Sequence, residues 1–169
     1  MIRIFIFSYS GDAAEAVACV RCARMAVPYA GITVVDDASN PVQEDIADAL
    51  RSMGADYVQS TWDRNGNLRG PDCIRGMLSE MCREAEPDDI LVKIDCDTAL
   101  LDDGWLRWMD DHPACPMYAS GDFINGSWRI YGCLYALRGW MARRLYQVMD
   151  WTLLDDLAPE DGRFWPGCR

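Results

Sequence analysis

Two aspartates follow an apolar segment in the second half of the chain. Residues 90–94 read ILVKI, and Asp95 and Asp97 come directly after them with one residue in between. Because the backbone can bend at the end of a strand, both carboxylates can approach one ion there. Carboxylates of this kind hold divalent cations that also bind substrate phosphates. We therefore predict a metal or phosphate role for the pair. The alternative is that Asp97, which precedes Thr98, only caps a turn.

Two earlier segments also end in polar residues. The first apolar segment ends at Ser8 and Tyr9, and the second ends at Asp36 and Asp37. If these strands are parallel to the one before Asp95, their carboxyl ends lie at one edge of the sheet, where ligands of such sheets bind. A carboxylate at this edge can accept hydrogen bonds from a ribose hydroxyl or a base N–H, which is the role we favour for Asp37. The alternative is that the acidic pair only turns the chain.

Short apolar segments alternate with segments of helical pattern along the chain. Strands are predicted at residues 2–7, 32–35, 56–60, 90–94 and 117–120, and a turn followed by a long strand at 125–137. Helices are predicted at about residues 12–25, 105–109 and 138–149, with two more between the second and fourth strands. This alternation predicts an α/β fold with a single, mostly parallel sheet flanked by helices.

The two helices between the second and fourth strands have local start signals. For the first, Asn40 is a suitable N-cap, Pro41 fits the first helical position and Gly54 ends the helix. The second begins at Pro71, and its apolar residues recur at helical spacing. That apolar stripe consists of Ile74, Met77, Leu78 and Met81.

The composition indicates an acidic globular domain. The 169 residues carry 27 acidic and 16 basic side chains, which gives a formal net charge of −11 and disfavours nucleic acid as a partner. The length fits one domain over residues 1–169. No apolar run approaches the roughly 20 residues of a transmembrane segment. The apolar part of the N-terminus is too short for a signal peptide, so we expect a cytoplasmic protein.

The eight cysteines lie in patterned segments. Cys19 and Cys22 form a CxxC pair, but the chain has no second such pair and no histidine near this one. On a helix this spacing is more typical of small apolar side chains in a core than of a zinc or redox site.

The order of these motifs resembles that of glycosyltransferases of the GT-A fold, close to the family-2 type. The stretches IFIFSYSGD, ITVVDDASNP and LVKIDCDTALL follow one another as the first strand, the acidic second strand end and the DxD motif of that family. NGNLRGPDCIRGML is similar to its loop and helix beside the nucleotide, GCLYALRGWMARRL to a later strand and helix, and PEDGRF to a late acidic motif. The resemblance covers about residues 2–164, and we expect a C-terminal end that is short for this family.

The resemblance implies an enzyme that moves a hexose from a nucleoside diphosphate sugar to a hydroxyl acceptor. Mn²⁺ or Mg²⁺ would bridge the diphosphate of the donor. Asp97 is then the best direct metal ligand, and Asp95 contacts the ribose or a metal-bound water. The nucleotide-binding residues implied in addition to Asp95 are Ser8, Tyr9, Asp37 and Arg69.

An inverting transferase of this kind also needs a carboxylate that deprotonates the acceptor hydroxyl. Asp161 is the candidate for this catalytic base, with Glu160 in reserve, and Asp122 is a further acid that could face the acceptor. Many members of the family supply a late histidine to the metal. The only histidine here is His112, which we expect in a surface turn and do not assign.

Two other functions fit parts of the sequence. LVKIDCDTAL also matches the motif of haloacid dehalogenase-type phosphatases, in which Asp95 would be the nucleophile and Asp97 the general acid. That chemistry calls for a lysine downstream, and none follows Lys93. The third possibility is a non-catalytic module that binds a nucleotide sugar without turnover.

Overall fold

The computed structural model describes residues 1–64, 68–124 and 127–151, without the side chains of residues 122–130. The strands are β1 (Ile2–Ser8), β2 (Gly31–Asp36), β3 (Asp56–Gln59), β4 (Ile90–Asp95), β5 (Met117–Ile124) and β6 (Ser127–Arg138). The α-helices are α1 (Ala13–Ala26), α2 (Glu44–Ser52), α4 (Pro71–Cys82), α5 (Gly104–Asp111) and α6 (Gly139–Val148), and a 3-10 turn spans Ser10–Asp12.

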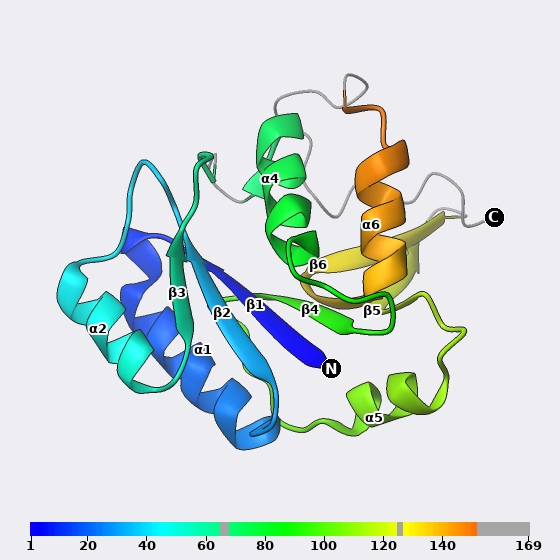
Figure 1. The fold of residues 1–169 in the computed structure, drawn as a ribbon, viewed down its shortest axis with the longest axis horizontal. Helices are drawn as coiled ribbons and strands as arrows, with labels where there is room; N and C mark the ends of the chain where they lie inside the picture. Colours follow the sequence, from blue (N-terminus) through cyan, green and yellow to red (C-terminus); the bar gives the residue numbers. More distant parts are fainter. Residues whose placement is uncertain (65–67, 125–126, 152–169) are drawn as a thin grey trace.

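The strands form one mixed sheet in the order β3-β2-β1-β4-β6-β5. Strands β1 to β4 are parallel to one another, whereas β6 is antiparallel to both of its neighbours, β4 and β5. Figure 1 shows helices on both sides of this sheet. The predicted α/β fold with a single, mostly parallel sheet flanked by helices is confirmed.

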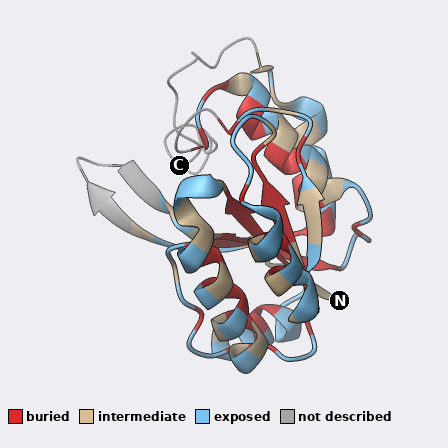
Figure 2. Cartoon of the chain, turned by 90° about the vertical axis from the view of Figure 1, so that its left-hand side faces the viewer, coloured by how far each residue is buried: buried red, intermediate tan, exposed pale blue. Residues whose placement is uncertain are grey.

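Alternate residues of the central strands fill two separate cores. Ile4 and Ile6 of β1 pack into the core beneath α1, together with residues of α2 and α5. Phe5 and Phe7 point to the opposite face and pack into the core beneath α4 and α6. Figure 2 shows the central strands buried between helices whose outer sides are exposed. The continuous apolar segments in the sequence therefore correspond to strands that are covered on both faces.

Helix α4 begins as its sequence predicts. Pro71 occupies the first turn, and Gly70 before it has a φ of 84°, a conformation that glycine adopts without strain. The predicted apolar stripe is buried in the core beneath this helix. None of the helices in the described part of the chain is both long and apolar enough to cross a membrane.

The predicted start of helix α2 is wrong. The helix begins at Glu44, with Gln43 as its N-cap, and not at Asn40 and Pro41. Two hydrogen bonds hold the preceding residues outside the helix: the amide of Val42 donates to the buried carboxylate of Asp36 at 2.7 Å, and the carbonyl of Asn40 accepts from the amide of Ser10 at 2.8 Å. This tertiary pairing outweighs the local cap signal.

Candidate active site

The polar strand ends lie at one edge of the sheet. In the parallel register, Phe7 pairs with Asp95 and Ser8 pairs with Asp36. The amide of Asp37 then donates to the carbonyl of Ser8 at 3.1 Å. The carboxyl ends of β1, β2 and β4 therefore meet, as the sequence predicted from parallel strands.

Arg64, in the segment between β3 and α4, joins the acidic residues of this edge. Its amide donates to Oδ1 of Asp37 at 2.9 Å, and its Nη1 donates to Oδ2 of Asp12 at 2.7 Å. The same oxygen of Asp12 accepts from the thiol of Cys96 at 2.9 Å. Because Cys96 separates Asp95 from Asp97, a continuous path of contacts leads from Asp37 to the DxD motif.

Asp36 is a structural residue of this edge. Its carboxylate is fully buried and accepts hydrogen bonds from the hydroxyl of Ser8 at 2.9 Å, from the amide of Val42 and from the hydroxyl of Tyr57. Burial, together with the hydrogen bond to Asp36, raises the pKa of Tyr57 above its ordinary value. A buried carboxylate with three donors is well satisfied, so Asp36 fixes the end of β2.

The two nucleotide-binding candidates on the first strand end differ in their surroundings. The side chain of Ser8 is 1% exposed and its hydroxyl is engaged by Asp36. Tyr9 is partly exposed, and the guanidinium of Arg64 lies over its ring at 4.7 Å from the centroid. A methyl group at Gly11 would overlap this ring, so the small residue there allows Tyr9 to pack closely over the turn. Contacts of Ser8 and Tyr9 with a nucleotide stay predictions.

The first aspartate of the DxD motif has a buried counter-ion. The Nζ of Lys93 lies 2.7 Å from Oδ1 of Asp95, and it also donates to the carbonyl of Gly132 on β6. The Lys93 side chain is 1% exposed, whereas that of Asp95 is 28% exposed. Residues two apart on a strand share a face, which places this ammonium beneath the carboxylate. Within the described part of the chain, the carboxylate of Asp95 is therefore held through Oδ1 only.

Asp97 is exposed, and no hydrogen bond or ion pair joins its carboxylate to another described residue. Asp97 and the second oxygen of Asp95 provide hard oxygen ligands, which suit Mg²⁺ or Mn²⁺ held jointly with phosphates and water. Within the described residues there is no group of three acidic, histidine or cysteine side chains that would hold a metal on its own. The residues present thus fit a cation that takes its remaining ligands from a bound diphosphate.

The cysteine within the motif is engaged by Asp12. Cys96 is buried, and burial together with the hydrogen bond to Asp12 raises the pKa of its thiol. The thiol of Cys96 donates a hydrogen bond to the carboxylate of Asp12 and so helps to fix its position.

The chain is similar to solved structures, but not to a protein-family model or a curated protein sequence. Among solved structures, it is similar to the galactosyltransferase LgtC in complex with donor and acceptor sugar analogues, with a TM-score of 0.59 and 15% identity, over 84% of this chain and 59% of that one. The chain has the GT-A fold.

Two further structures agree with this fold. The mannosyltransferase PcManGT from Pyrobaculum calidifontis, in complex with GDP-Man and Mn²⁺, has a TM-score of 0.54 and 17% identity, over 86% of this chain and 45% of that one. S. aureus TarS 1–349 has a TM-score of 0.54 and 12% identity, over 82% and 47%. The chain thus covers between 45% and 59% of the length of these three structures.

The remaining predicted residues are not among those that form the contacts of this edge, and some of them fall outside the described residues. Asp161 and Glu160 are outside the described residues, as is the side chain of Asp122. Arg69 is exposed and lines a groove beside α4. His112 is exposed just after α5, where its ring stacks on Trp108 at a centroid distance of 4.1 Å, in agreement with the expected surface position.

Three residues of the edge were not assigned from the sequence: Asp12, Arg64 and Lys93. Asp12 ends the first polar stretch SYSGD, and Lys93 is the only lysine of the chain, placed inside an otherwise apolar strand. Both residues could have been assigned to the edge from these signals. For Lys93 the reason is that a charged residue in a buried strand requires a partner. Nothing in the sequence around Arg64 indicates its contact with Asp37, which depends on the tertiary fold.

Proposed function

We propose that this GT-A domain binds a nucleoside diphosphate sugar with a divalent cation and transfers the sugar to a hydroxyl acceptor. The observation that carries the proposal is the path of contacts from Asp37 through Arg64 and Asp12 to the DxD motif. It brings a carboxylate suited to a base or ribose to the same edge as a carboxylate pair suited to a metal. The GT-A fold, shared with a galactosyltransferase and a mannosyltransferase, supports the same reaction class.

The cation would be held by Asp97 directly and by the oxygen of Asp95 that Lys93 leaves available. When bound, Mn²⁺ or Mg²⁺ supplies Lewis-acid stabilisation of the negative charge on the departing nucleoside diphosphate. The ion pair with Lys93 fixes the orientation of the Asp95 carboxylate. Because the net charge of the chain is −11, such a cation would also offset the repulsion between the protein and a diphosphate.

The nucleoside would lie across the ends of β1 and β2. Asp37 is the group that accepts hydrogen bonds from the ribose or base, and its orientation is fixed by the amide of Arg64. Tyr9 presents a partly exposed ring beside it, and Ser8 contributes mainly by fixing Asp36. Arg69 is proposed near the phosphates.

Asp161 is proposed as the base that accepts the proton of the acceptor hydroxyl, with Glu160 in reserve. The Asp161→Asn change separates the enzyme from the binding module. An enzyme keeps metal-dependent donor binding and loses transfer by several orders of magnitude, whereas a module without turnover has no transfer to lose.

The direct test is a panel of UDP- and GDP-sugars, measured by thermal shift and by release of nucleoside diphosphate with and without Mn²⁺. We expect one base to stabilise the protein only when the metal is present, and release to accelerate when a hydroxyl acceptor is added. A phosphatase assay on sugar phosphates tests the haloacid dehalogenase alternative. Stabilisation by no nucleotide sugar, or turnover of sugar phosphates instead, would contradict the proposal.

A further inference from the structure

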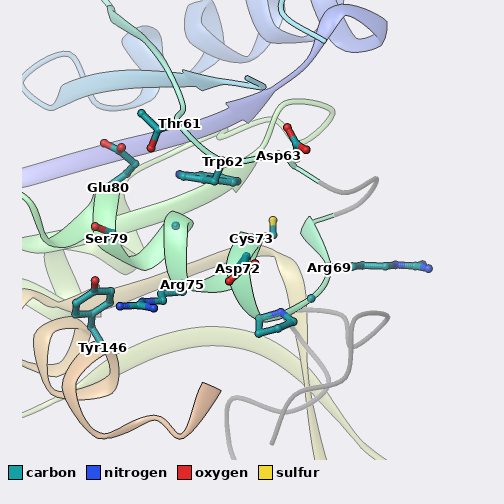
Figure 3. A pocket seen from close by; sticks show the side chains of 13 residues that line it. Thr61, Trp62, Asp63, Arg69, Asp72, Cys73, Arg75, Ser79, Glu80 and Tyr146 are labelled. Carbon is teal, nitrogen blue, oxygen red and sulfur yellow. The ribbon is translucent and has the colours of Figure 1, made fainter. Parts of the chain in front are cut away.

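A groove of about 700 Å³ runs beside α4, on the face of the sheet that α4 and α6 cover. It is lined by the segment after β3, by the outer side of α4 and by Tyr146 of α6. Figure 3 shows Trp62 near its centre, with Arg75, Ser79 and Tyr146 toward one end. The DxD motif and Asp37 are not among its lining residues, but Arg69 is, so the groove adjoins the candidate donor site without including its carboxylates.

Trp62 gives the groove a fixed aromatic surface. The indole packs so closely on Gly76 of α4 that any β-carbon there would overlap it, and its ring centroid lies 6.2 Å from that of Phe7 on β1. Its Nε1–H is shielded from solvent and has no hydrogen-bond partner among the described residues. Because this donor is closed to solvent, it is also closed to a ligand in the groove, so the ring of Trp62 and not its N–H is the part that a ligand can contact.

Three polar side chains of the groove are available to a ligand. Arg75, Ser79 and Asp72 are exposed and make no hydrogen bond or ion pair with another residue of the described chain. Arginines and carboxylates both occur along the lining, and one of the carboxylates, Glu80, pairs with Arg83 at 3.2 Å. This mixture does not favour a phosphate or another strongly charged ligand, and it suits an uncharged molecule with many hydroxyl groups.

The groove reaches the edge of the sheet that carries the candidate active site. Trp62 lies two residues before Arg64, which contacts both Asp37 and Asp12. A ligand several sugar units long, bound over Trp62, would therefore have one end near the strand ends. Aromatic faces beside hydrogen-bonding groups recognise sugars, because the apolar face of the sugar ring packs on the aromatic ring.

We propose that the α4 groove binds an uncharged oligosaccharide, which is the acceptor of the transfer reaction. The role as acceptor site rests on the proposed function, whereas the binding of the oligosaccharide does not. Trp62 provides the apolar stacking surface, and Arg75 donates to the sugar hydroxyls. The groove volume of about 700 Å³ lies within the range of roughly 300–1,000 Å³ that is typical of small-molecule sites.

The test measures binding of lactose, maltose, cellobiose and their trisaccharide homologues by saturation-transfer NMR and calorimetry, without nucleotide or metal. Trp62→Leu removes the aromatic ring and keeps an apolar side chain, and Arg75→Ala removes the guanidinium from an exposed helix position. Arg21→Ala is the matched control, because Arg21 is an exposed arginine on α1, on the opposite face of the sheet. Circular dichroism and the unfolding midpoint check that each variant folds.

We expect at least one of these saccharides to bind the parent and Arg21→Ala equally, and Trp62→Leu and Arg75→Ala to bind it roughly tenfold more weakly. In transfer assays the same two variants should raise the KM for the acceptor and leave that for the donor unchanged. No binding by the parent, or equal binding by all four proteins, would overturn the proposal. Saccharide binding without any donor binding would leave the groove in place and reject the transferase function instead.

Discussion

The Nζ of Lys93 lies 2.7 Å from Oδ1 of Asp95, two residues farther along β4. The only lysine of the chain is thus buried in the central strand that leads into the DxD motif. A buried ammonium is costly unless it is paired and hydrogen-bonded, and Asp95 with the carbonyl of Gly132 satisfies it. The ion pair fixes one oxygen of Asp95 and leaves the other for a ligand.

We predict that Lys93 and Asp95 are energetically coupled. Lys93→Met leaves a partly buried carboxylate without its counter-ion, so it should lower the free energy of unfolding more in the parent than in an Asp95→Asn background. The double-mutant cycle, measured by urea unfolding, should give a coupling of about 1–3 kcal/mol. Additive effects of the two changes would show that the pair contributes nothing to the folded state.

Arg64 should stabilise the edge through its pair with Asp12. Arg64→Met removes the 2.7 Å ion pair and the contact with the Tyr9 ring but keeps an apolar side chain of similar length. We expect a loss of about 2 kcal/mol in the free energy of unfolding, because Asp12 would keep only the weak thiol donor of Cys96. Arg21→Met, at an exposed position of α1, is the control. If both variants unfold at the same denaturant concentration, Arg64 is not a structural link.

Gly139 at the start of α6 should tolerate no side chain. A β-carbon at this position would overlap the backbone carbonyl oxygen of Glu86, which is not the end of a flexible side chain and cannot move aside easily. Gly139→Ala should therefore lower the free energy of unfolding by about 3 kcal/mol or more. Gly31→Ala is matched to it, because a β-carbon at Gly31 has no neighbour within 4 Å. Equal unfolding midpoints for the two variants would refute the close approach.

The buried thiol of Cys19 should contribute to stability loss at alkaline pH. Burial, with smaller effects from Cys22, Asp95 and Asp97, raises the pKa of this thiol from 9.0 to about 12. A group with a raised folded pKa stabilises the fold fully below the unfolded pKa and loses this contribution as the pH rises to the folded one. Between pH 9 and about 12, stability should thus fall by up to roughly 1.4 kcal/mol per pH unit from this group.

The control for this prediction is Cys19→Ala, which lacks the titrating group. Its free energy of unfolding, measured by guanidinium titration in steps from pH 7 to pH 10.5, should be lower than that of the parent at pH 7 because a buried sulfur is lost. The difference in the free energy of unfolding between the parent and Cys19→Ala should become smaller above pH 9. A constant gap over the whole range would show that the thiol does not titrate differently in the folded and unfolded chains.

Most strands and helices of this fold could be predicted from the sequence because they are specified by local patterns. The apolar segments of β1, β2 and β4 are too continuous for surface strands, and the stripe on α4 repeats at helical spacing. The order of strand ends then predicted that Ser8, Asp37 and Asp95 share an edge. The predicted start of α2 was wrong because the buried carboxylate of Asp36 binds the amide of Val42, a contact that no local pattern reveals.

The candidate site was only partly accessible for a related reason. The carboxylates could be found because they follow apolar strands, but the residues that orient them could not be assigned. Arg64 reaches Asp12 across a sequence separation of 52 residues, and Cys96 reaches the same carboxylate across 84. Such contacts exist only once the parallel strands have aligned. A sequence therefore predicts the carboxylates at the strand ends better than the residues that orient them.

The most direct test of the account is calorimetric titration of GDP and UDP into the parent and into Asp97→Ala, each with and without Mn²⁺. Asp97 is exposed and has no hydrogen-bond partner among the described residues, so its loss should leave the fold and its stability unchanged. Asp111→Ala, another exposed aspartate, is the control. The account predicts Mn²⁺-dependent binding of one nucleotide by the parent and Asp111→Ala, and binding at least roughly a hundredfold weaker, about 2.7 kcal/mol, by Asp97→Ala. Equal Mn²⁺-dependent affinity in all three proteins would contradict it.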